Sequence, residues 1–193
     1  MNLLVLTDRS LVPPGRSLVD VVRAAVEGGA THAVLREKDL DRAERAALAG
    51  ELRAFVPVLL VASDPSVEGD GVHLAAADPF PADRPRVVGR SCHSRADLEQ
   101  AAREGCDYAT LSPIFESASK PGYGPALGVR ALHDAPLPVY SLGGVDPTNA
   151  RSCIDAGATG VAVMGYVMRA DDPAVAVKEL LSREAEPTGE DSP

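Results

Sequence analysis

The chain has 193 residues, of which 45% are hydrophobic and 24% charged, a composition typical of a single globular domain with its own core. Its formal net charge is −9, and it contains four Tyr, three Phe and no Trp. The negative charge disfavours DNA and anionic membranes as partners, and so few aromatic rings offer no platform for stacking nucleic-acid bases. We therefore expect no nucleic acid and no membrane as partner.

The first segment, Met1–Asp8, is an apolar run without the basic residues that open a signal peptide, so we interpret it as a strand. Three cysteines lie in separate apolar stretches, without the spacing of a metal site: Cys92, Cys106 and Cys153. We expect them to be buried, reduced thiols, and hence we expect a cytoplasmic protein.

Short aliphatic runs alternate with longer helical patterns along the chain. The eight predicted strands are Leu3–Thr7, Ala33–Arg36, Val58–Val61, Gly71–Leu74, Val87–Gly89, Tyr108–Leu111, Val139–Leu142 and Gly160–Met164. Between most of them apolar residues recur at helical spacing, as at Leu18, Val22 and Val26. Near-continuous apolar strands separated by helices indicate a parallel sheet that is covered on both faces.

Eight such units predict an α/β fold, a compact (β/α)8 TIM barrel, and an open doubly wound sheet is the alternative. Segments 66–68 and 75–86 are too short or too rich in proline for full helices, so we expect shortened connections after strands 3 and 4. Residues 1–181 then form a single barrel domain. The acidic segment 182–193 is expected to be a disordered tail.

The carboxyl ends of barrel strands carry the functional site, and cations gather at these ends here. Arg36 and Lys38 end the second strand, and Lys120 lies in the long segment after the sixth. The chain has only one other lysine, Lys178. Each charge alone is well explained as a solvated loop residue, but three at strand ends favour a cationic rim that binds an anionic substrate.

A second anion signal follows the seventh strand. Gly143 and Gly144 precede Asp146 and Pro147, a sequence that predicts a helix start with Asp146 as its N-cap. Backbone N–H groups at such a start bind phosphate, and Gly165 offers a small residue after the eighth strand, where barrels often hold phosphate. The alternative is that these glycines are ordinary turn residues.

Asp64 and Asp78 follow the third and fourth strands. They could bind a hard cation such as Mg²⁺, which prefers carboxylate and phosphate oxygens. A cation beside Arg36 and Lys38 would complete a clamp for pyrophosphate, whereas an aspartate alone is more typical of a loop cap. His73 lies within the apolar fourth strand, so we interpret it as a packed or supporting residue rather than a catalytic base.

As an ordered set, the motifs of this chain resemble the superfamily of thiamine phosphate synthases and TenI-type thiazole tautomerases. The resemblance covers about residues 2–180. The matching segments are Leu35–Lys38, Asp70–Leu74 with Asp78, Gly89–His93, Asp107–Tyr108, Ser112–Phe115, Ser117–Lys120 and Leu142–Gly144. Each motif alone is weak, and their common order from strand 1 to strand 8 makes the set specific.

The resemblance implies a transferase that joins hydroxymethylpyrimidine diphosphate to hydroxyethylthiazole phosphate, in thiamine biosynthesis, and releases pyrophosphate. By position, the pyrophosphate would be held by Arg36, Lys38, Ser91 and Lys120, and Mg²⁺ by Asp64 and Asp78. The two lysines and the arginine are the expected catalytic residues. The thiazole phosphate would be bound by Ser117, Ser119, Gly143, Gly144 and Gly165.

Three positions depart from the family patterns. Val34 stands where the synthases carry Gln, Ser63 where they carry Asn, and Pro113 where the tautomerase branch carries its His. The alternative functions are a thiazole phosphate tautomerase, which is an isomerase, and a non-catalytic protein that binds thiazole phosphate or thiamine phosphate. We expect small phosphorylated substrates as partners, and the sequence leaves a homo-oligomer open.

Overall fold

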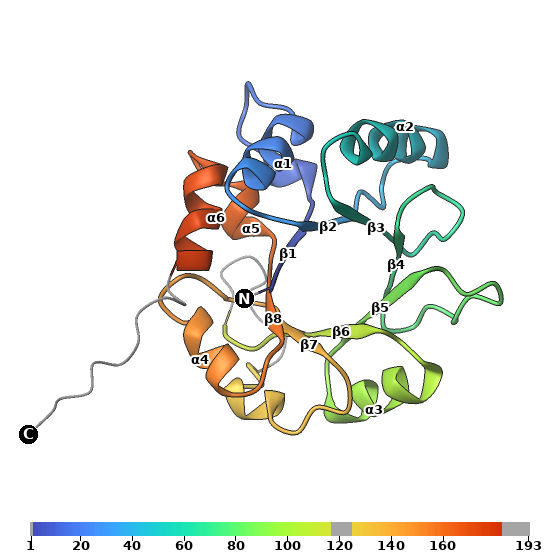
Figure 1. Cartoon of the computed structure of the whole chain (residues 1–193), viewed down its shortest axis with the longest axis vertical. Helices are drawn as coiled ribbons and strands as arrows, with labels where there is room; N and C mark the ends of the chain where they lie inside the picture. Colours follow the sequence, from blue (N-terminus) through green and yellow to red (C-terminus); the bar gives the residue numbers. More distant parts are fainter. Residues whose placement is uncertain (1, 117–124, 183–193) are drawn as a thin grey trace, which may run out of the picture.

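The computed structural model describes residues 2–116 and 125–182, in which eight parallel strands close into a barrel in chain order (Figure 1). The strands are β1 (Asn2–Leu6), β2 (His32–Leu35), β3 (Val58–Ala62), β4 (Gly71–Leu74), β5 (Val87–Cys92), β6 (Tyr108–Leu111), β7 (Val139–Ser141) and β8 (Gly160–Val163). Because β8 pairs in parallel with β1, the sheet is closed. The predicted (β/α)8 barrel is confirmed, and the open doubly wound sheet is excluded.

The helices lie outside the ring of strands (Figure 1). They are α1 (Leu18–Glu27), α2 (Arg42–Arg53), α3 (Arg95–Glu104), α4 (Ala150–Asp155), α5 (Gly165–Met168) and α6 (Pro173–Ser182), with 3-10 turns η1 (Arg9–Leu11) and η2 (Val129–Leu132). In the described ranges no helix follows β3 or β4, as the shortened connections predicted. None of the described helices is long and apolar enough to cross a membrane.

The predicted start of the tail needs a correction. Ser182 is the last residue of α6, so the expectation that the tail begins at residue 182 was wrong by one residue. The side of α6 that holds Val177 and Leu180 is fully buried, and this packing continues the helix to its end. Residues 183–193, on which the rest of this prediction falls, lie outside the described part of the chain.

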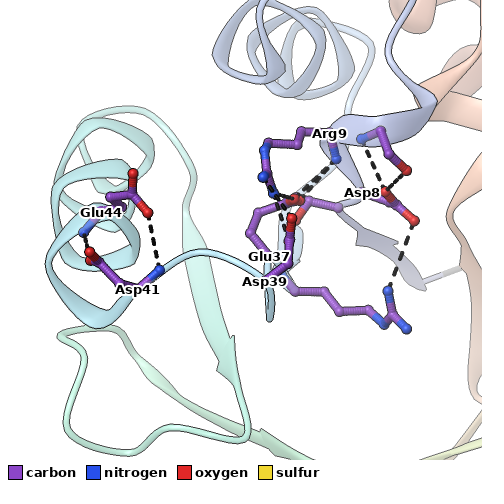
Figure 2. A network of polar contacts seen from close by, with 9 residues as sticks. Asp8, Arg9, Glu37, Asp39, Asp41 and Glu44 are labelled. Carbon is purple, nitrogen blue, oxygen red and sulfur yellow. Dashed lines mark hydrogen bonds and ion pairs between the residues drawn. The ribbon is translucent and has the colours of Figure 1, made fainter.

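The helices that follow β1 and β2 begin with capping boxes written in the sequence. Ser17 and Asp20 exchange side-chain and backbone hydrogen bonds at the start of α1, and Asp41 and Glu44 do so at the start of α2 (Figure 2). Each box satisfies two N–H groups that the first turn of a helix leaves without partners. The box of α2 thereby fixes the end of segment 36–40, which carries the predicted cations.

Side chains alternate across the barrel wall, so each strand contributes to two apolar clusters. The outward-facing side chains pack beneath the helices. The inward-facing ones fill the barrel, and the buried members of this inner cluster are Leu4, Leu6, Val34, Leu60, Ala62, Tyr108 and Ala162. Val34 is fully buried there, so its position belongs to the packed interior.

The three cysteines are buried and unpaired, as predicted. Burial raises the pKa of each thiol, that of Cys92 to about 12, so all three stay protonated at neutral pH. A thiol rather than a thiolate is a poor nucleophile and a poor metal ligand. The cysteines therefore act as small packed side chains.

Candidate functional site

The segment after β2 carries the predicted cations Arg36 and Lys38 on either side of a buried glutamate. Glu37 is only 3% exposed. Both of its carboxylate oxygens accept hydrogen bonds from the Arg9 backbone N–H at 3.1 Å, and the Arg9 guanidinium lies 3.2 Å from Oε2 (Figure 2). The same guanidinium binds Asp39 at 2.6 and 2.7 Å. These contacts join the segments after β1 and β2 and hold the backbone that carries both cations.

The two cations lie near groups on the neighbouring strands. Burial, and then the positive charges of Lys38 and Arg36, lower the pKa of His73 to about 4. Burial acts to raise the pKa of Asp78, but hydrogen bonds to its carboxylate and the positive charge of Lys38 outweigh it, so that pKa is lowered. Arg36 and Lys38 after β2, and Asp78 after β4, thus lie at the same mouth of the barrel, and their charges act on His73.

Arg90 on β5 supports this cluster, and the sequence reasoning gave it no role. It is 4% exposed, and its Nη1 donates to the carbonyl oxygens of Ala75, Ala76 and Asp78 at 2.9–3.1 Å. Its Nη2 lies 2.8 Å from Oε2 of Glu104 on α3. Arg90 therefore fixes the helix-free connection that carries Asp78. No local signal marks Arg90, because it directly follows the short run Val87–Gly89 and its partners come from an earlier segment of the chain.

Ser91, predicted to bind pyrophosphate, is partly exposed near the carboxyl end of β5. Its Oγ lies 3.0 Å from Nε2 of His73, and His73 Nδ1 lies 2.7 Å from the Tyr108 hydroxyl. His73 is 4% exposed, which confirms the prediction of a packed, supporting residue. The serine hydroxyl is therefore connected to the interior of the barrel.

The predicted Mg²⁺ ligands have different surroundings. Nη2 of Arg45, on α2, lies 2.6 Å from Oδ2 of Asp64, and Ser66 donates to Oδ1 through its N–H and its hydroxyl. Burial acts to raise the pKa of Asp64, but the Ser66 hydrogen bonds and the positive charge of Arg45 lower it overall. Because the pKa of Asp78 is lowered as well, both carboxyl groups are ionised at neutral pH.

Two ionised carboxylates fit the donor chemistry of Mg²⁺, which takes one or two carboxylates together with the phosphate oxygens of a substrate. In the described part of the chain, no three His, Cys, Asp or Glu side chains are grouped so that they could hold a metal by themselves. A cation here would therefore need phosphate oxygens to complete its coordination. Asp64 is already paired with Arg45, so Asp78 is the less committed of the two candidate ligands.

Gly143 and Gly144 follow β7 with φ angles of 91° and 65°. A Cβ at Gly144 would lie 2.5 Å from the carbonyl oxygen of Glu116, and one at Gly143 would lie 2.9 Å from Cα of Pro113. Both the backbone conformation and the available space therefore require glycine. The pair packs directly against the segment that leaves β6, at the same rim of the barrel as the cations.

The helix start predicted at Asp146 is too early, although Asp146 caps the turn before the helix: its carbonyl oxygen accepts from the Ala150 N–H at 2.9 Å. α4 begins at Ala150 with Asn149 in the N-cap position, whereas Asp146 Oδ1 accepts hydrogen bonds from the Thr148 N–H and hydroxyl in the preceding turn. Aspartate caps turns as well as helices, because its short side chain reaches the N–H two residues further on. The predicted phosphate cradle therefore consists of loop backbone at the two glycines.

Gly165, predicted to complete the cradle, is the first residue of α5. The guanidinium of Arg169, one turn later, lies so close that a side chain at position 165 would overlap with it. Arg169 is exposed, and the sequence reasoning missed this cation, although its spacing from Gly165 was a usable signal. The remaining predicted residues, Ser117, Ser119 and Lys120, lie outside the described residues.

A cavity of about 420 Å³ lies at the opposite mouth of the barrel. Its lining includes the residue directly before each of six strands, namely Pro57, Asp70, Arg86, Asp107, Pro138 and Thr159. None of the predicted site residues in the described ranges lines it. The predicted site residues of the described ranges lie instead at the other mouth, where the strands end.

A family model described as thiamine monophosphate synthase matches residues 3–167. A thiamine-phosphate synthase of Roseiflexus castenholzii is 36% identical over 198 residues, which cover 91% of this chain and 85% of the relative. A thiamine-phosphate synthase of Thermosynechococcus vestitus is 36% identical over 88% of this chain. The match covers 53% of that longer relative. The solved thiamine phosphate pyrophosphorylase of Pyrococcus furiosus superposes with a TM-score of 0.80 at 29% identity, over 94% of each chain.

Proposed function

The chain belongs to the thiamine monophosphate synthase family and is a transferase of that family, and from this premise we propose that it joins hydroxymethylpyrimidine diphosphate to hydroxyethylthiazole phosphate and releases pyrophosphate. The observation that carries this proposal is that Arg36 and Lys38 directly follow β2 and Asp78 follows β4, at the mouth of the barrel where the strands end. Fixed cations at this place suit a leaving group that carries several negative charges.

The proposed reaction breaks one bond and forms another. The C–O bond between the pyrimidine methylene and the diphosphate breaks, and its electron pair leaves with the pyrophosphate. The lone pair of the thiazole nitrogen forms the new C–N bond to the methylene carbon, so that the thiazole ring becomes positively charged. No step requires the protein to remove a proton. The site must therefore orient two substrates and stabilise the charge on the leaving pyrophosphate.

The leaving pyrophosphate would be bound on the β2–β5 side. Arg36 and Lys38 supply positive charge, and the Ser91 hydroxyl supplies a hydrogen-bond donor beside them. Lys120, from the segment after β6, is the proposed third cation. Because Arg9 and Glu37 hold the segment after β2, Arg36 and Lys38 are positioned before the substrate binds.

Mg²⁺ is the cofactor in this proposal, and Asp78 and Asp64 are the residues that would hold it. When bound, it would neutralise part of the charge of the diphosphate. Arg90 fixes the connection that carries Asp78, whereas Asp64 would share its carboxylate between Arg45 and the cation. Both groups are ionised at neutral pH because their pKa values are lowered.

The thiazole phosphate would be bound on the β7–β8 side. The proposed contacts are those of Gly143, Gly144, Gly165, Ser117 and Ser119, to which the structure adds Arg169 as a nearby cation. Backbone N–H groups at tightly packed glycines can approach a phosphate closely, because no side chain stands between them. The two phosphate groups of the reaction would thus occupy different sides of the same rim.

The test is product formation with a matched pair of lysine variants. The chain, incubated with both substrates and Mg²⁺, should yield thiamine phosphate and pyrophosphate in equal amounts. Lys38→Ala should lower kcat/KM by about 100-fold or more, as does removal of other groups that stabilise transition-state charge. Lys178→Ala, an exposed lysine on α6, should leave it unchanged.

No product at high protein concentration would overturn the transferase proposal. Calorimetry with thiazole phosphate alone would then identify a binding protein by retained affinity. Conversion of a thiazole phosphate tautomer would identify an isomerase. Equal losses in Lys38→Ala and Lys178→Ala would contradict the assigned place of the site, even if product forms.

A further inference from the structure

Three polar side chains form a connected row through the interior of the barrel. The Tyr108 hydroxyl, on β6, lies 2.7 Å from Nδ1 of His73, on β4. Nε2 of His73 lies 3.0 Å from Oγ of Ser91, on β5. Tyr108 is 7% exposed and His73 is 4% exposed, whereas Ser91 is partly exposed at the rim. The row therefore connects the buried interior with the proposed pyrophosphate site.

The sequence builds this row through the strand register. His73 pairs with Gly89, and Gly89 pairs with Tyr108, so the three residues lie side by side across β4, β5 and β6. A Cβ at position 89 would overlap with the Tyr108 ring. Only a glycine on the middle strand lets the phenol ring cross that strand and reach His73. The contact between Tyr108 and His73 therefore depends on the glycine at position 89.

The row has one consistent arrangement of protons. Burial raises the pKa of Tyr108 well above its ordinary value, so the phenol keeps its proton. A buried O–H group needs an acceptor, and among the described residues the Tyr108 hydroxyl bonds only to Nδ1 of His73. The hydroxyl therefore donates to Nδ1, which leaves the single ring proton of a neutral imidazole on Nε2.

The charges around His73 also favour its neutral form. Burial, Lys38, Arg36 and Arg90 lower its pKa, and only Asp78 acts to raise it. A neutral imidazole protonated on Nε2 donates to Ser91 Oγ. Since that oxygen is then an acceptor toward His73, the hydroxyl proton of Ser91 is left for another acceptor.

We propose that Tyr108 and His73 are positioning residues, which hold the imidazole in its Nε2–H form and thereby turn the Ser91 hydroxyl into a hydrogen-bond donor for the leaving pyrophosphate. The role of Ser91 as a contact of pyrophosphate rests on the proposed function. The tautomer itself does not, because it follows from the contacts within the barrel. The two parts can therefore be tested separately.

The first test measures the tautomer without any substrate. ¹⁵N NMR of the full chain at pH 7 should show His73 protonated on Nε2 and not on Nδ1, with its signals assigned by their loss in His73→Gln. Tyr108→Phe removes the donor to Nδ1 and should shift the ring toward a mixture of both tautomers. Tyr140→Phe is the control, because its ring packs on Tyr108 with centroids 5.5 Å apart but lies outside the row. An Nδ1–H or a doubly protonated His73 in the unmodified chain overturns the proposal.

The second test is a double-mutant cycle on the reaction. Tyr108→Phe should lower kcat in proportion to the share of His73 that leaves the Nε2–H form, about 2-fold for an even mixture, with little change in KM. In a Ser91→Ala background the same change should have no further effect, because its target hydroxyl is gone. His73→Gln should retain part of the kcat, because its amide can donate to Ser91. His73→Leu, which has no donor, should retain less.

The outcomes distinguish a failure of the positioning role of Tyr108 and His73 from a failure of the proposed transferase function. Multiplicative losses in the cycle mean that Tyr108 acts structurally, and they overturn the positioning role. If the unmodified chain forms no product, the proposed function fails, while the NMR result still decides the tautomer. If product forms and Ser91→Ala has full activity, Ser91 does not contact the leaving group, and the positioning role is overturned with the transferase intact.

Discussion

The rim of the barrel has two halves that are built in different ways. On the β2–β5 side the proposed anion-binding groups are side chains, and buried partners hold their segments in place: Glu37 with Arg9, Arg90, and His73 with Tyr108. On the β7–β8 side the proposed groups are largely backbone, and close packing at the two glycines after β7 holds them. Where side chains bind the anion, substitution of a supporting partner should weaken binding only in part. Where backbone N–H groups bind it, a side chain introduced at the glycine should abolish binding.

The largest expected effect is on the β7–β8 side. Gly144→Ala places a Cβ 2.5 Å from a carbonyl oxygen at a φ of 65°, so we expect the free energy of unfolding to fall by about 2–4 kcal/mol. Urea unfolding measures it. The control is Gly50→Ala, in open space on α2, which should gain about 0.5–1 kcal/mol because alanine favours helix. A loss below about 0.5 kcal/mol in Gly144→Ala would refute the packing argument.

The second effect is a pH dependence that originates on the β2–β5 side. The pKa of His73 is about 4 in the folded chain, against about 6.5 in the unfolded chain. Between these values the unfolded state binds more protons, so stability falls as the pH drops from about 6.5 toward 4. For this one group the loss amounts to about 3 kcal/mol at most. Burial also lowers the pKa of His32, which adds a loss of the same sign.

Urea unfolding at several pH values between 7 and 4.5 measures this loss. His73→Gln removes the titrating group, so its stability should fall less steeply than that of the unmodified chain over the same range. His133→Gln, an exposed histidine, should keep the original slope. The same slope in His73→Gln and in the unmodified chain would show that His73 is not held neutral.

The strands of both halves could be predicted because apolar residues dominate them, and the turns between them carry glycine and charge. Two strands were predicted too short: β3 by one residue, Ala62, and β5 by three, since it runs over Val87–Cys92 and not Val87–Gly89. Arg90 and Ser91 are polar and therefore look like a strand end. Arg90 is nevertheless buried, because carbonyl oxygens 12 to 15 residues earlier in the chain fold back onto it. A local pattern cannot show such partners.

The candidate site could be predicted only as a set of residue types at strand ends. Lys38 and Asp78 were predicted this way, and their roles stay predictions, while the positive charge of Lys38 helps to lower the pKa of Asp78. The partners that hold them were not found, because Arg9 and Glu37 are 28 residues apart and neither is unusual for a loop. The rule that two glycines and an aspartate start a helix also failed after β7, where a turn uses the same residue types.

A third effect tests whether the β2–β5 side depends on its buried partners. Glu37→Gln keeps the shape of the side chain but removes its charge beside Arg9. We expect a loss of about 1–3 kcal/mol in unfolding free energy and about a 10-fold lower kcat/KM, because Arg36 and Lys38 lose their fixed orientation. Asp39→Asn, at a side chain 69% exposed on the same guanidinium, should cost much less stability because solvent screens this pair. Equal losses of stability and kcat/KM in the two variants would show that the buried Glu37 carboxylate holds the segment no more firmly than the exposed Asp39 does.

The smallest effect concerns Ser63, in the described part of the chain the one non-glycine residue of the β2–β5 side with a positive φ. Ser63 has a φ of 58°, in the left-handed region that asparagine adopts more readily than serine. Ser63→Asn should therefore raise the unfolding free energy by about 0.5 kcal/mol, whereas Ser152→Asn within α4 should give no gain. Because the Ser63 N–H donates to the His73 carbonyl oxygen at 3.0 Å, this conformation joins β3 to the strand of the positioning histidine. If Ser63→Asn gains stability without any change in kcat, the relief of backbone strain at position 63 does not move His73. The β2–β5 side would then be rigid enough to keep the position of His73 unchanged.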